Sequence, residues 1–242
     1  MGAGSARQRR HPTHRSRLRV GAASGDRRDR RMGRDAEADG CCRAGCGRQP
    51  HERCEVRSCA GRIWAGTMAL DLRPAAGALY RIGQDFAVER MVAATTVANG
   101  LGWSPGGSVM YFIDSLEYGV DVFDYDASSG EIANRRRCIT IDPEDGVPDG
   151  MTVDANGDIW VALFGGGAVR RYGATGALAE EIALPASQVT SCAFGGPALD
   201  ELYVTTAVTG LSPEQHAAQP AAGKLLRCDV GVHGLLATRF SG

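Results

Sequence analysis

The chain has 242 residues, of which 43% are hydrophobic, and its formal net charge is −1 at pH 7. This length suits one all-β domain or two smaller domains, and the near-neutral charge excludes a chain that is basic or acidic throughout. The N-terminal region has no apolar segment of the kind that forms a secretory signal. No P-loop, dinucleotide-binding fingerprint or HExxH motif occurs, so nucleotide-binding and zincin functions have no support.

The first 60 residues differ in composition from the rest of the chain. They contain fifteen Arg, seven acidic residues and no Lys, Phe, Tyr, Trp or Ile, whereas residues 61–242 carry twelve basic and twenty-one acidic residues. A segment with so little apolar surface cannot offset the entropy lost on ordering, which predicts disorder. This composition is also typical of a GC-rich gene translated in the wrong frame. We therefore interpret residues 1–59 as disordered or frame-shifted.

Three functional interpretations of this basic segment have weaker support. An Arg-rich arm could neutralise phosphates, but the aromatic or Lys residues typical of nucleic-acid arms are missing. A transit peptide agrees with the absence of acids before Asp26, yet aliphatic residues are too few for an amphipathic helix. A metal site would need His51 and cysteines whose spacing resembles no zinc knuckle or ribbon. Those cysteines are Cys41, Cys42, Cys46, Cys54 and Cys59. We expect neither a nucleic-acid nor a membrane partner.

After residue 60, a turn with Gly or Asp is followed repeatedly by a short hydrophobic strand that ends in an aromatic residue. The aromatic residues are 47, 49 and 43 positions apart: Trp64, Tyr111, Trp160 and Tyr203. Self-similarity at such a period indicates an array of units that bury their faces against one another. Because helical periodicity is absent from nearly all of this region, the array is predicted to be a β-propeller.

The predicted strands follow one another with turn signals between them. They cover residues 108–113, 120–125, 151–153, 159–163, 168–172, 199–205 and 224–228. A single helical turn is expected at Pro213–Ala218. A period near 46 gives about four blades for residues 60–242, and the first strands of blade one would fall in the Arg-rich segment. The expected fold is a partial β-propeller with exposed edge strands.

Two polar residues occupy matching positions in consecutive units. Asn99 precedes Gly-Leu-Gly-Trp103, and 50 residues later Asp149 precedes Gly-Met-Thr-Val153. In a propeller this register places both side chains at the same end of the central channel, where amide and carboxylate oxygens could bind a divalent cation. The alternative is a pair of tight turns, because Asn-Gly and Pro-Asp-Gly are common turn sequences. The spacing alone favours the turns.

Weaker candidates are strand-end residues that can cap a turn, residues of the loop after that strand, and residues that open the next unit at the register of Asn99 and Asp149. Ser191, in the last group, has no convincing His partner for a nucleophilic triad. His216 and His233 lie in loop-like positions and are predicted to be solvated. The strand-end residues are Asp114 and Ser115, and the loop residues are Glu117 and Tyr118. The residues that open the next unit are Ser191 and Cys192.

The cysteines after residue 60 are isolated from one another. Cys138, Cys192 and Cys228 are predicted to be buried or inert thiols. Since no signal peptide is evident, a reducing cytoplasmic location is expected.

The region after residue 60 resembles the senescence-marker-protein/regucalcin/gluconolactonase family of six-bladed β-propellers. The resemblance runs from about Ala60 to the C-terminus, which corresponds to the C-terminal two thirds of the family's propeller. The matching stretches are Asn99-Gly-Leu-Gly-Trp-Ser104, Tyr111-Phe-Ile-Asp-Ser115, Val122-Phe-Asp-Tyr-Asp126, Pro148-Asp-Gly-Met151, Asp158-Ile-Trp-Val-Ala162 and Thr190-Ser-Cys-Ala-Phe-Gly-Gly196.

The resemblance implies one divalent cation (Ca²⁺, Zn²⁺, Mn²⁺ or Mg²⁺) held by a Glu, an Asn and an Asp. The Asn of an Asn-Gly-Leu motif corresponds to Asn99, and the Asp of a Pro-Asp-Gly motif corresponds to Asp149. Asp149 is also the implied catalytic acid/base in the hydrolysis of a sugar lactone to the aldonic acid. The regucalcin branch of the family implies an alternative, a non-enzymatic calcium-binding regulator.

The chain departs from the family in its first blade. The family's Glu belongs to a Glu-Gly-Pro-type motif that nothing before residue 60 matches. The segment that grips the sugar in the family is replaced here by residues 54–59, so the substrate-binding residues remain unassigned. Two of six blades are therefore expected to be missing, together with one metal ligand. Loss of a ligand predicts a weaker metal site, and an inactive fragment is the third interpretation.

Overall fold

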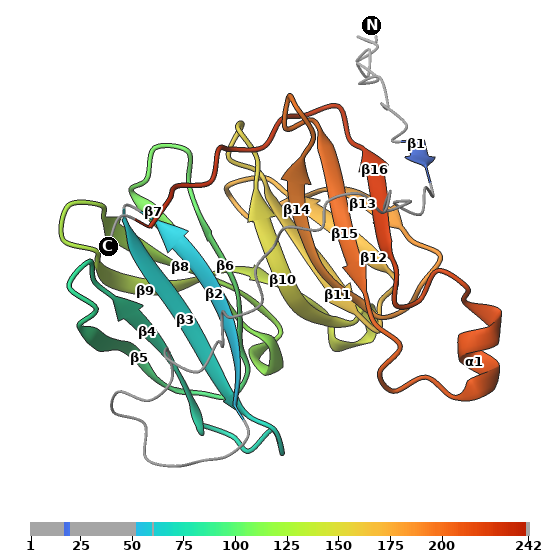
Figure 1. Ribbon diagram of the computed structural model, residues 1–242, viewed down its shortest axis with the longest axis horizontal. Coiled ribbons are helices and arrows are strands. Elements are labelled where there is room, and N and C mark those ends of the chain that lie inside the picture. The colour runs from blue at the N-terminus through green and yellow to red at the C-terminus, as the bar shows by residue number, and fades with distance from the viewer. Residues whose placement is uncertain (1–16, 20–51, 60, 241–242) are drawn as a thin grey trace, which may run out of the picture.

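The computed structural model describes residues 17–19, 52–59 and 61–240, which form four antiparallel sheets of four strands each (Figure 1). Three sheets consist of consecutive strands, in the orders β2-β3-β4-β5, β6-β7-β8-β9 and β10-β11-β12-β13. The fourth has the order β1-β16-β15-β14, because a strand from near the N-terminus pairs with β16. The predicted all-β, four-blade array is confirmed.

The bounds of the elements are as follows. The first sheet contains β2 (Glu52–Cys59), β3 (Arg62–Ala69), β4 (Gly77–Ile82) and β5 (Val88–Thr95). The second contains β6 (Ala98–Trp103), β7 (Val109–Asp114), β8 (Gly119–Asp126) and β9 (Glu131–Thr140). The third contains β10 (Val147–Val153), β11 (Ile159–Phe164), β12 (Ala168–Tyr172) and β13 (Leu178–Ala183). The fourth contains β14 (Val189–Gly195), β15 (Glu201–Thr206), β16 (Leu225–Asp229) and β1 (Arg17–Arg19). Short 3-10 helices η1 (Ser115–Glu117) and η2 (Pro143–Asp145) and the helix α1 (Pro213–Ala218) complete the list.

Most of residues 1–59 lie outside the described residues, including Cys41, Cys42, Cys46 and His51. Two pieces of this segment are described as strands. Glu52–Cys59 forms β2 and pairs with Arg62–Ala69 along its whole length, and Arg17–Arg19 forms β1 beside β16. The first sheet therefore draws its first strand from the Arg-rich part of the chain.

The recurring aromatic residues occupy the same strand of every sheet. Trp64, Tyr111, Trp160 and Tyr203 lie on β3, β7, β11 and β15, the second strand in each case. The sequence period therefore corresponds to one four-stranded sheet. The helical turn also lies where it was expected, at α1, whose first turn is closed by a capping box between Ser212 and Gln215.

The hydrophobic core lies between successive sheets rather than within one of them. A cluster with Trp64, Leu101 and Phe112 joins the first two sheets. A second cluster, which includes Ile113, Met151 and Val161, joins the second sheet to the third. A third cluster, which includes Trp160, Val204 and Leu226, joins the third sheet to the fourth. Each inner sheet thus buries both faces, so its second strand is apolar on both sides, as β11 is (Ile-Trp-Val-Ala-Leu).

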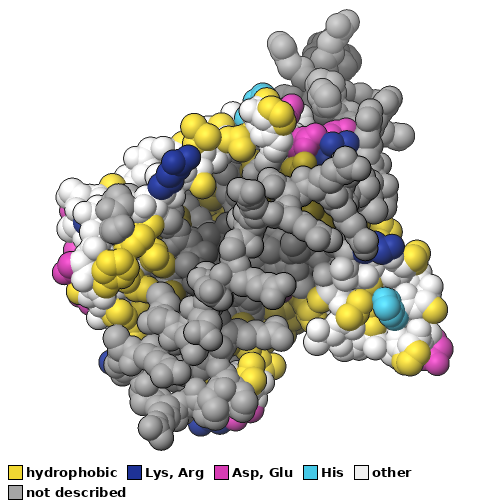
Figure 2. All heavy atoms as spheres, viewed as in Figure 1, with side chains coloured by type: hydrophobic (Ala, Val, Ile, Leu, Met, Phe, Trp, Pro, Cys, Tyr) yellow, Lys and Arg dark blue, Asp and Glu magenta, His cyan; other side chains and the backbone are white. Residues whose placement is uncertain are grey.

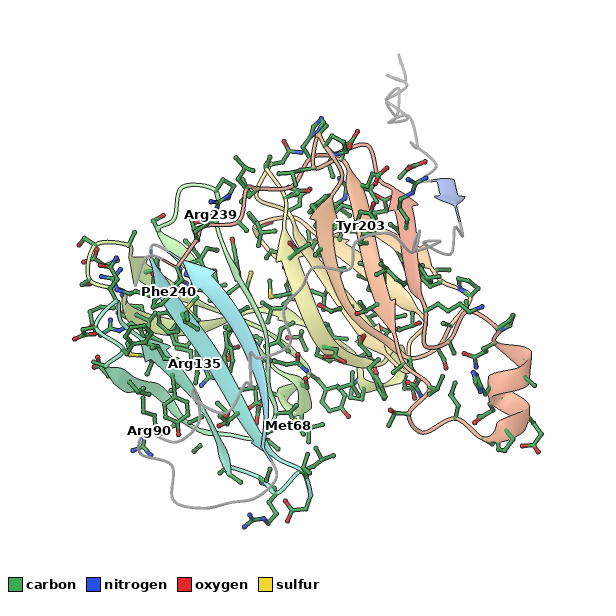
Figure 3. All side chains as sticks on the ribbon, in the orientation of Figure 1. Met68, Arg90, Arg135, Tyr203, Arg239 and Phe240 are labelled. Atoms are coloured by element: carbon green, nitrogen blue, oxygen red, sulfur yellow. The ribbon has the colours of Figure 1, made fainter. Side chains whose placement is uncertain are left out.

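The segment after β16 runs back across the array to the first sheet (Figure 1). On the way, the carbonyl oxygen of His233 accepts a hydrogen bond from the backbone N–H of Ala155, 2.8 Å away, just beyond β10. The ring of Phe240 then packs edge-on against Phe86, with 5.6 Å between centroids (Figure 3). Phe86 is still 66% exposed, and Figure 2 shows hydrophobic side chains gathered on the left side of this face.

An ion-pair network fixes the loop that leads into β10. Arg170 on β12 donates a 2.7 Å hydrogen bond to Asp145, at the end of η2, and a 2.6 Å hydrogen bond to Glu181 on β13. The hydrogen bond from Arg170 lowers the pKa of Asp145 below its usual 3.8, although burial acts in the opposite direction. A carboxyl group whose pKa is lower in the folded state stabilises the fold above its unfolded pKa. This contribution to the free energy of unfolding is lost as the pH falls through the pKa of the folded state.

Replacing Arg170 by Met should remove the charge while keeping most of the side-chain volume. We expect Asp145 to titrate at a higher pH in Arg170→Met, and the difference in thermal stability between variant and wild type to shrink as the pH falls below 3.8. Carboxyl-carbon NMR titration and thermal melts measure these two effects. The control is Arg73→Met, because Arg73 forms an ion pair with Asp71 in which both side chains are exposed to solvent. An unchanged Asp145 titration in Arg170→Met would contradict the assignment.

Candidate functional site

Asn99 and Asp149 lie on the first strands of the second and third sheets. These strands, β6 and β10, are neighbours in the array (Figure 1). The amide nitrogen Nδ2 of Asn99 donates a hydrogen bond to Oδ1 of Asp149 over 2.6 Å. Both residues are half-buried, so the pair keeps contact with solvent. The structure thus brings together two oxygen-bearing side chains that are 50 residues apart in the sequence.

A register shift recurs at the same place in three first strands. The pairing with the second strand shifts between Ala98 and Leu101 in β6, and between Pro148 and Met151 in β10. A corresponding shift lies between Val189 and Ser191 in β14. Such bulges redirect side chains and are frequent beside active sites. Asn99, Asp149 and Thr190 are the first residues that fall inside them, and Gly100 and Gly150 follow in the first two.

The third bulge corrects the register assigned from the sequence. Thr190, rather than Ser191 or Cys192, corresponds to Asn99 and Asp149, and its hydroxyl lies 2.7 Å from that of Thr205. Cys192 is buried, and its sulfur lies 3.5 Å from the carbonyl oxygen of Trp160. The sequence contained a pattern that indicates this register, because the first residue of each bulge lies two positions before a buried apolar residue.

The glycines after Asn99 and Asp149 serve close packing between strands, not tight turns. Both lie inside β6 and β10, and neither has a positive φ. A Cβ atom on Gly100 would lie 2.7 Å from the carbonyl oxygen of Asp149. A Cβ atom on Gly150 would lie 2.6 Å from Cβ of Ser191. Only glycine lets neighbouring first strands approach this closely, and the turn interpretation of the two motifs is therefore wrong.

Asp114 and Ser115 connect the end of β7 to the start of β6. The carboxylate of Asp114 accepts hydrogen bonds from the backbone N–H groups of Thr96 and Val97, both over 2.8 Å. It does not cap η1, although the sequence allowed that role. The hydroxyl oxygen of Ser115 accepts a hydrogen bond from Nδ2 of Asn99 over 3.1 Å.

The remaining candidates contribute less to this site. Glu117 is exposed, and Tyr118 closes η1 in the left-handed conformation with a φ of 48°. His216 on α1 and His233 near the C-terminus are both exposed, as the sequence predicted. No described helix is long and apolar enough to cross a membrane.

The donor set at Asn99 and Asp149 suits a hard or borderline divalent cation. Carboxylate and amide oxygens are typical ligands of Ca²⁺, which also accepts water as a ligand. Among the described residues, no group of three or more His, Cys, Asp or Glu side chains is placed to hold a metal ion. The candidate ligands at this place are the side-chain oxygens of Asn99 and Asp149.

Burial disfavours metal ligation by the thiolates of Cys228 and Cys138. Burial raises the pKa of the Cys228 thiol to about 11, so it stays protonated at neutral pH. Burial also raises the pKa of Cys138. Because a thiol must lose its proton to bind metal, burial opposes metal binding at both side chains.

These features define a class of protein: a β-propeller-type array with an amide–carboxylate pair on neighbouring first strands. Residues 55–208 match the family model described as the SMP-30/Gluconolactonase/LRE-like region. The chain belongs to this family.

Sequence comparison gives the same assignment. The chain is 42% identical to regucalcin of Homo sapiens over 190 residues, which is 76% of this chain and 64% of the relative. It is 41% identical to regucalcin of Danio rerio over 187 residues, 76% of this chain and 63% of the relative. The chain thus spans slightly less than two thirds of the length of the curated relatives it matches.

Solved structures agree with the fold. A luciferin-regenerating enzyme superposes with a TM-score of 0.71 at 38% identity, covering 77% of this chain and 64% of its own. A calcium-binding protein, regucalcin, from Agrobacterium tumefaciens superposes with a TM-score of 0.76 at 29% identity, covering 79% and 66%.

The close approach at Gly150 yields a stability prediction. Gly150→Ala should lower the free energy of unfolding by about 1–3 kcal/mol, because the added methyl group overlaps Ser191 on β14. Gly106→Ala is the matched control, since nothing lies within 4 Å of the added Cβ there. Urea denaturation measures both variants, and equal effects of the two substitutions would refute the packing role of Gly150.

Proposed function

We propose that this chain hydrolyses a sugar lactone to the corresponding aldonic acid, with a divalent cation held by Asn99 and Asp149. The observation that carries the proposal is the 2.6 Å contact between these side chains on neighbouring first strands. Membership of a family named in part for gluconolactonase supports the reaction class.

Asp149 is the catalytic acid/base in this proposal. One of its carboxylate oxygens takes a proton from the water that attacks the lactone carbonyl carbon. The ester bond to the ring oxygen then breaks, and the same carboxyl group returns the proton to that oxygen, which leaves a hydroxyl and a carboxylic acid. A cation bound beside it would supply polarisation of the carbonyl group and a lower pKa for the water.

Asn99 has two tasks in the same proposal. Its Nδ2 holds Oδ1 of Asp149 by a hydrogen bond and so fixes the carboxylate plane. Its carbonyl oxygen Oδ1 is not used in that bond and would supply the second protein ligand. An ionised acceptor makes the Asn99–Asp149 hydrogen bond stronger than one between neutral groups.

A second candidate function is calcium binding without catalysis. It is favoured by the similarity to human regucalcin and to an Agrobacterium regucalcin described as a calcium-binding protein. The same two side chains would hold the ion. The two functions differ in one property, because a regulator binds Ca²⁺ but leaves a lactone intact.

Asp149→Asn separates these functions. The substitution keeps the shape of the side chain but removes the proton acceptor, so lactone hydrolysis should fall by roughly 10²–10⁴-fold. Turnover is measured with glucono-δ-lactone and each of Ca²⁺, Zn²⁺, Mn²⁺ and Mg²⁺, and EDTA should abolish it. The control is Asp124→Asn, at an exposed aspartate on β8 that pairs with Arg136.

Three outcomes are informative. Loss of turnover in Asp149→Asn with an unchanged thermal melt supports the hydrolase. Retained turnover in that variant contradicts the role of Asp149. Calcium binding by a wild-type chain that hydrolyses no lactone supports the regulator instead.

A further inference from the structure

Ser115 is a buried polar residue next to the candidate site. It begins η1 immediately after β7, and only 3% of its surface is exposed. Its hydroxyl oxygen lies 3.1 Å from Nδ2 of Asn99. Asn99 therefore donates hydrogen bonds from one nitrogen to two acceptors, Ser115 just beyond the second sheet and Asp149 on the third.

Backbone bonds hold Ser115 in place without its hydroxyl. Its N–H donates to the carbonyl oxygen of Val97 over 2.9 Å, two residues before Asn99. Its own carbonyl oxygen accepts from the N–H of Tyr118 over 3.2 Å. The preceding Asp114 carboxylate binds the N–H groups of Thr96 and Val97. The end of β7 is thus tied to the start of β6, and the hydroxyl is presented to Asn99 from a fixed position.

The two acceptors determine the orientation of the Asn99 amide. Both hydrogens of Nδ2 are engaged, so the carbonyl oxygen Oδ1 takes part in neither contact. A rotation of the amide by 180° would place Oδ1 against a carboxylate oxygen, which is repulsive, and would forfeit the hydrogen bond to Asp149, while the Ser115 hydroxyl would have to donate to Oδ1 instead of accepting from Nδ2. A cation would compete with Asn99 for the electron pairs of the Asp149 carboxylate. The hydrogen bond between Asn99 and Ser115 does not involve the carboxylate, so a cation bound to Asp149 leaves it in place.

We propose that Ser115 is a positioning residue that holds the Asn99 amide in place at the cation site. The inference rests on the proposed metal-binding function of Asn99 and Asp149. Hydrogen-bond partners of metal ligands commonly change metal affinity by about 10–100-fold when they are removed. Without the Ser115 hydroxyl, the amide keeps only its hydrogen bond to Asp149, so its position at the cation site is less constrained.

The test compares Ser115→Ala, Ser115→Thr and a control, Ser104→Ala. Thr keeps a hydroxyl in the same position. Ser104 accepts a hydrogen bond from the N–H of Val109 at the start of the same sheet, so its loss removes one comparable bond outside the site. Thermal melts establish that each variant is folded.

Two readouts are recorded for every variant. Calorimetric titration with CaCl₂ and with MnCl₂ gives the divalent-cation affinity. NMR of the side-chain amide of Asn99, identified by its disappearance in Asn99→Asp, gives the rate at which its hydrogens exchange with water. The exposed side chain of Asn156 is the internal reference for a freely exchanging amide.

We expect Ser115→Ala to weaken cation binding by about tenfold or more and to accelerate exchange of the Asn99 amide. Ser115→Thr and Ser104→Ala should resemble wild type in both readouts. Unchanged amide exchange in Ser115→Ala would overturn the inference, as would wild-type Asn99 exchanging as fast as Asn156. If the wild type binds neither cation, the proposed function fails, and the amide readout still decides whether Ser115 positions Asn99.

Discussion

The close approach of neighbouring first strands is the constraint on which the arrangement of the site depends. At Gly100 and Gly150 the adjacent sheet comes so near that a Cβ atom would collide with Asp149 or Ser191. Wider spacing would leave the core between the sheets poorly packed, because Met151 and Val189 belong to the clusters that fill those same gaps. The glycines therefore serve the core and the site together.

This approach also determines which polar groups meet. Asn99 and Asp149 each precede one of these glycines and lie in a bulge, so their side chains leave the regular alternation of the strand. The amide and the carboxylate then satisfy each other at 2.6 Å. The Asp114–Ser115 corner fixes the start of β6 from the other side. A shift of either strand by one residue would separate the pair.

The sequence predicted the repeat and the fold class because the aromatic residue on the second strand recurs in every sheet. It could not decide between turns and a site at Asn99-Gly100 and Asp149-Gly150. Both alternatives need glycine, and only the packing of separate sheets distinguishes a close approach from a positive φ. The register of Thr190 was misassigned by one residue because bulges shift strand pairing locally. The contact of Ser115 with Asn99 leaves no signature in the sequence, since it depends on how η1 folds back on β6.

The most direct test of the central claim is anomalous diffraction from a crystal of the protein soaked with Mn²⁺. The account predicts one site with a peak about 2.0–2.6 Å from an oxygen of Asn99 and an oxygen of Asp149, the range of metal–oxygen ligand distances. A peak elsewhere, or none at these residues while they keep their direct contact at saturating Mn²⁺, would contradict it.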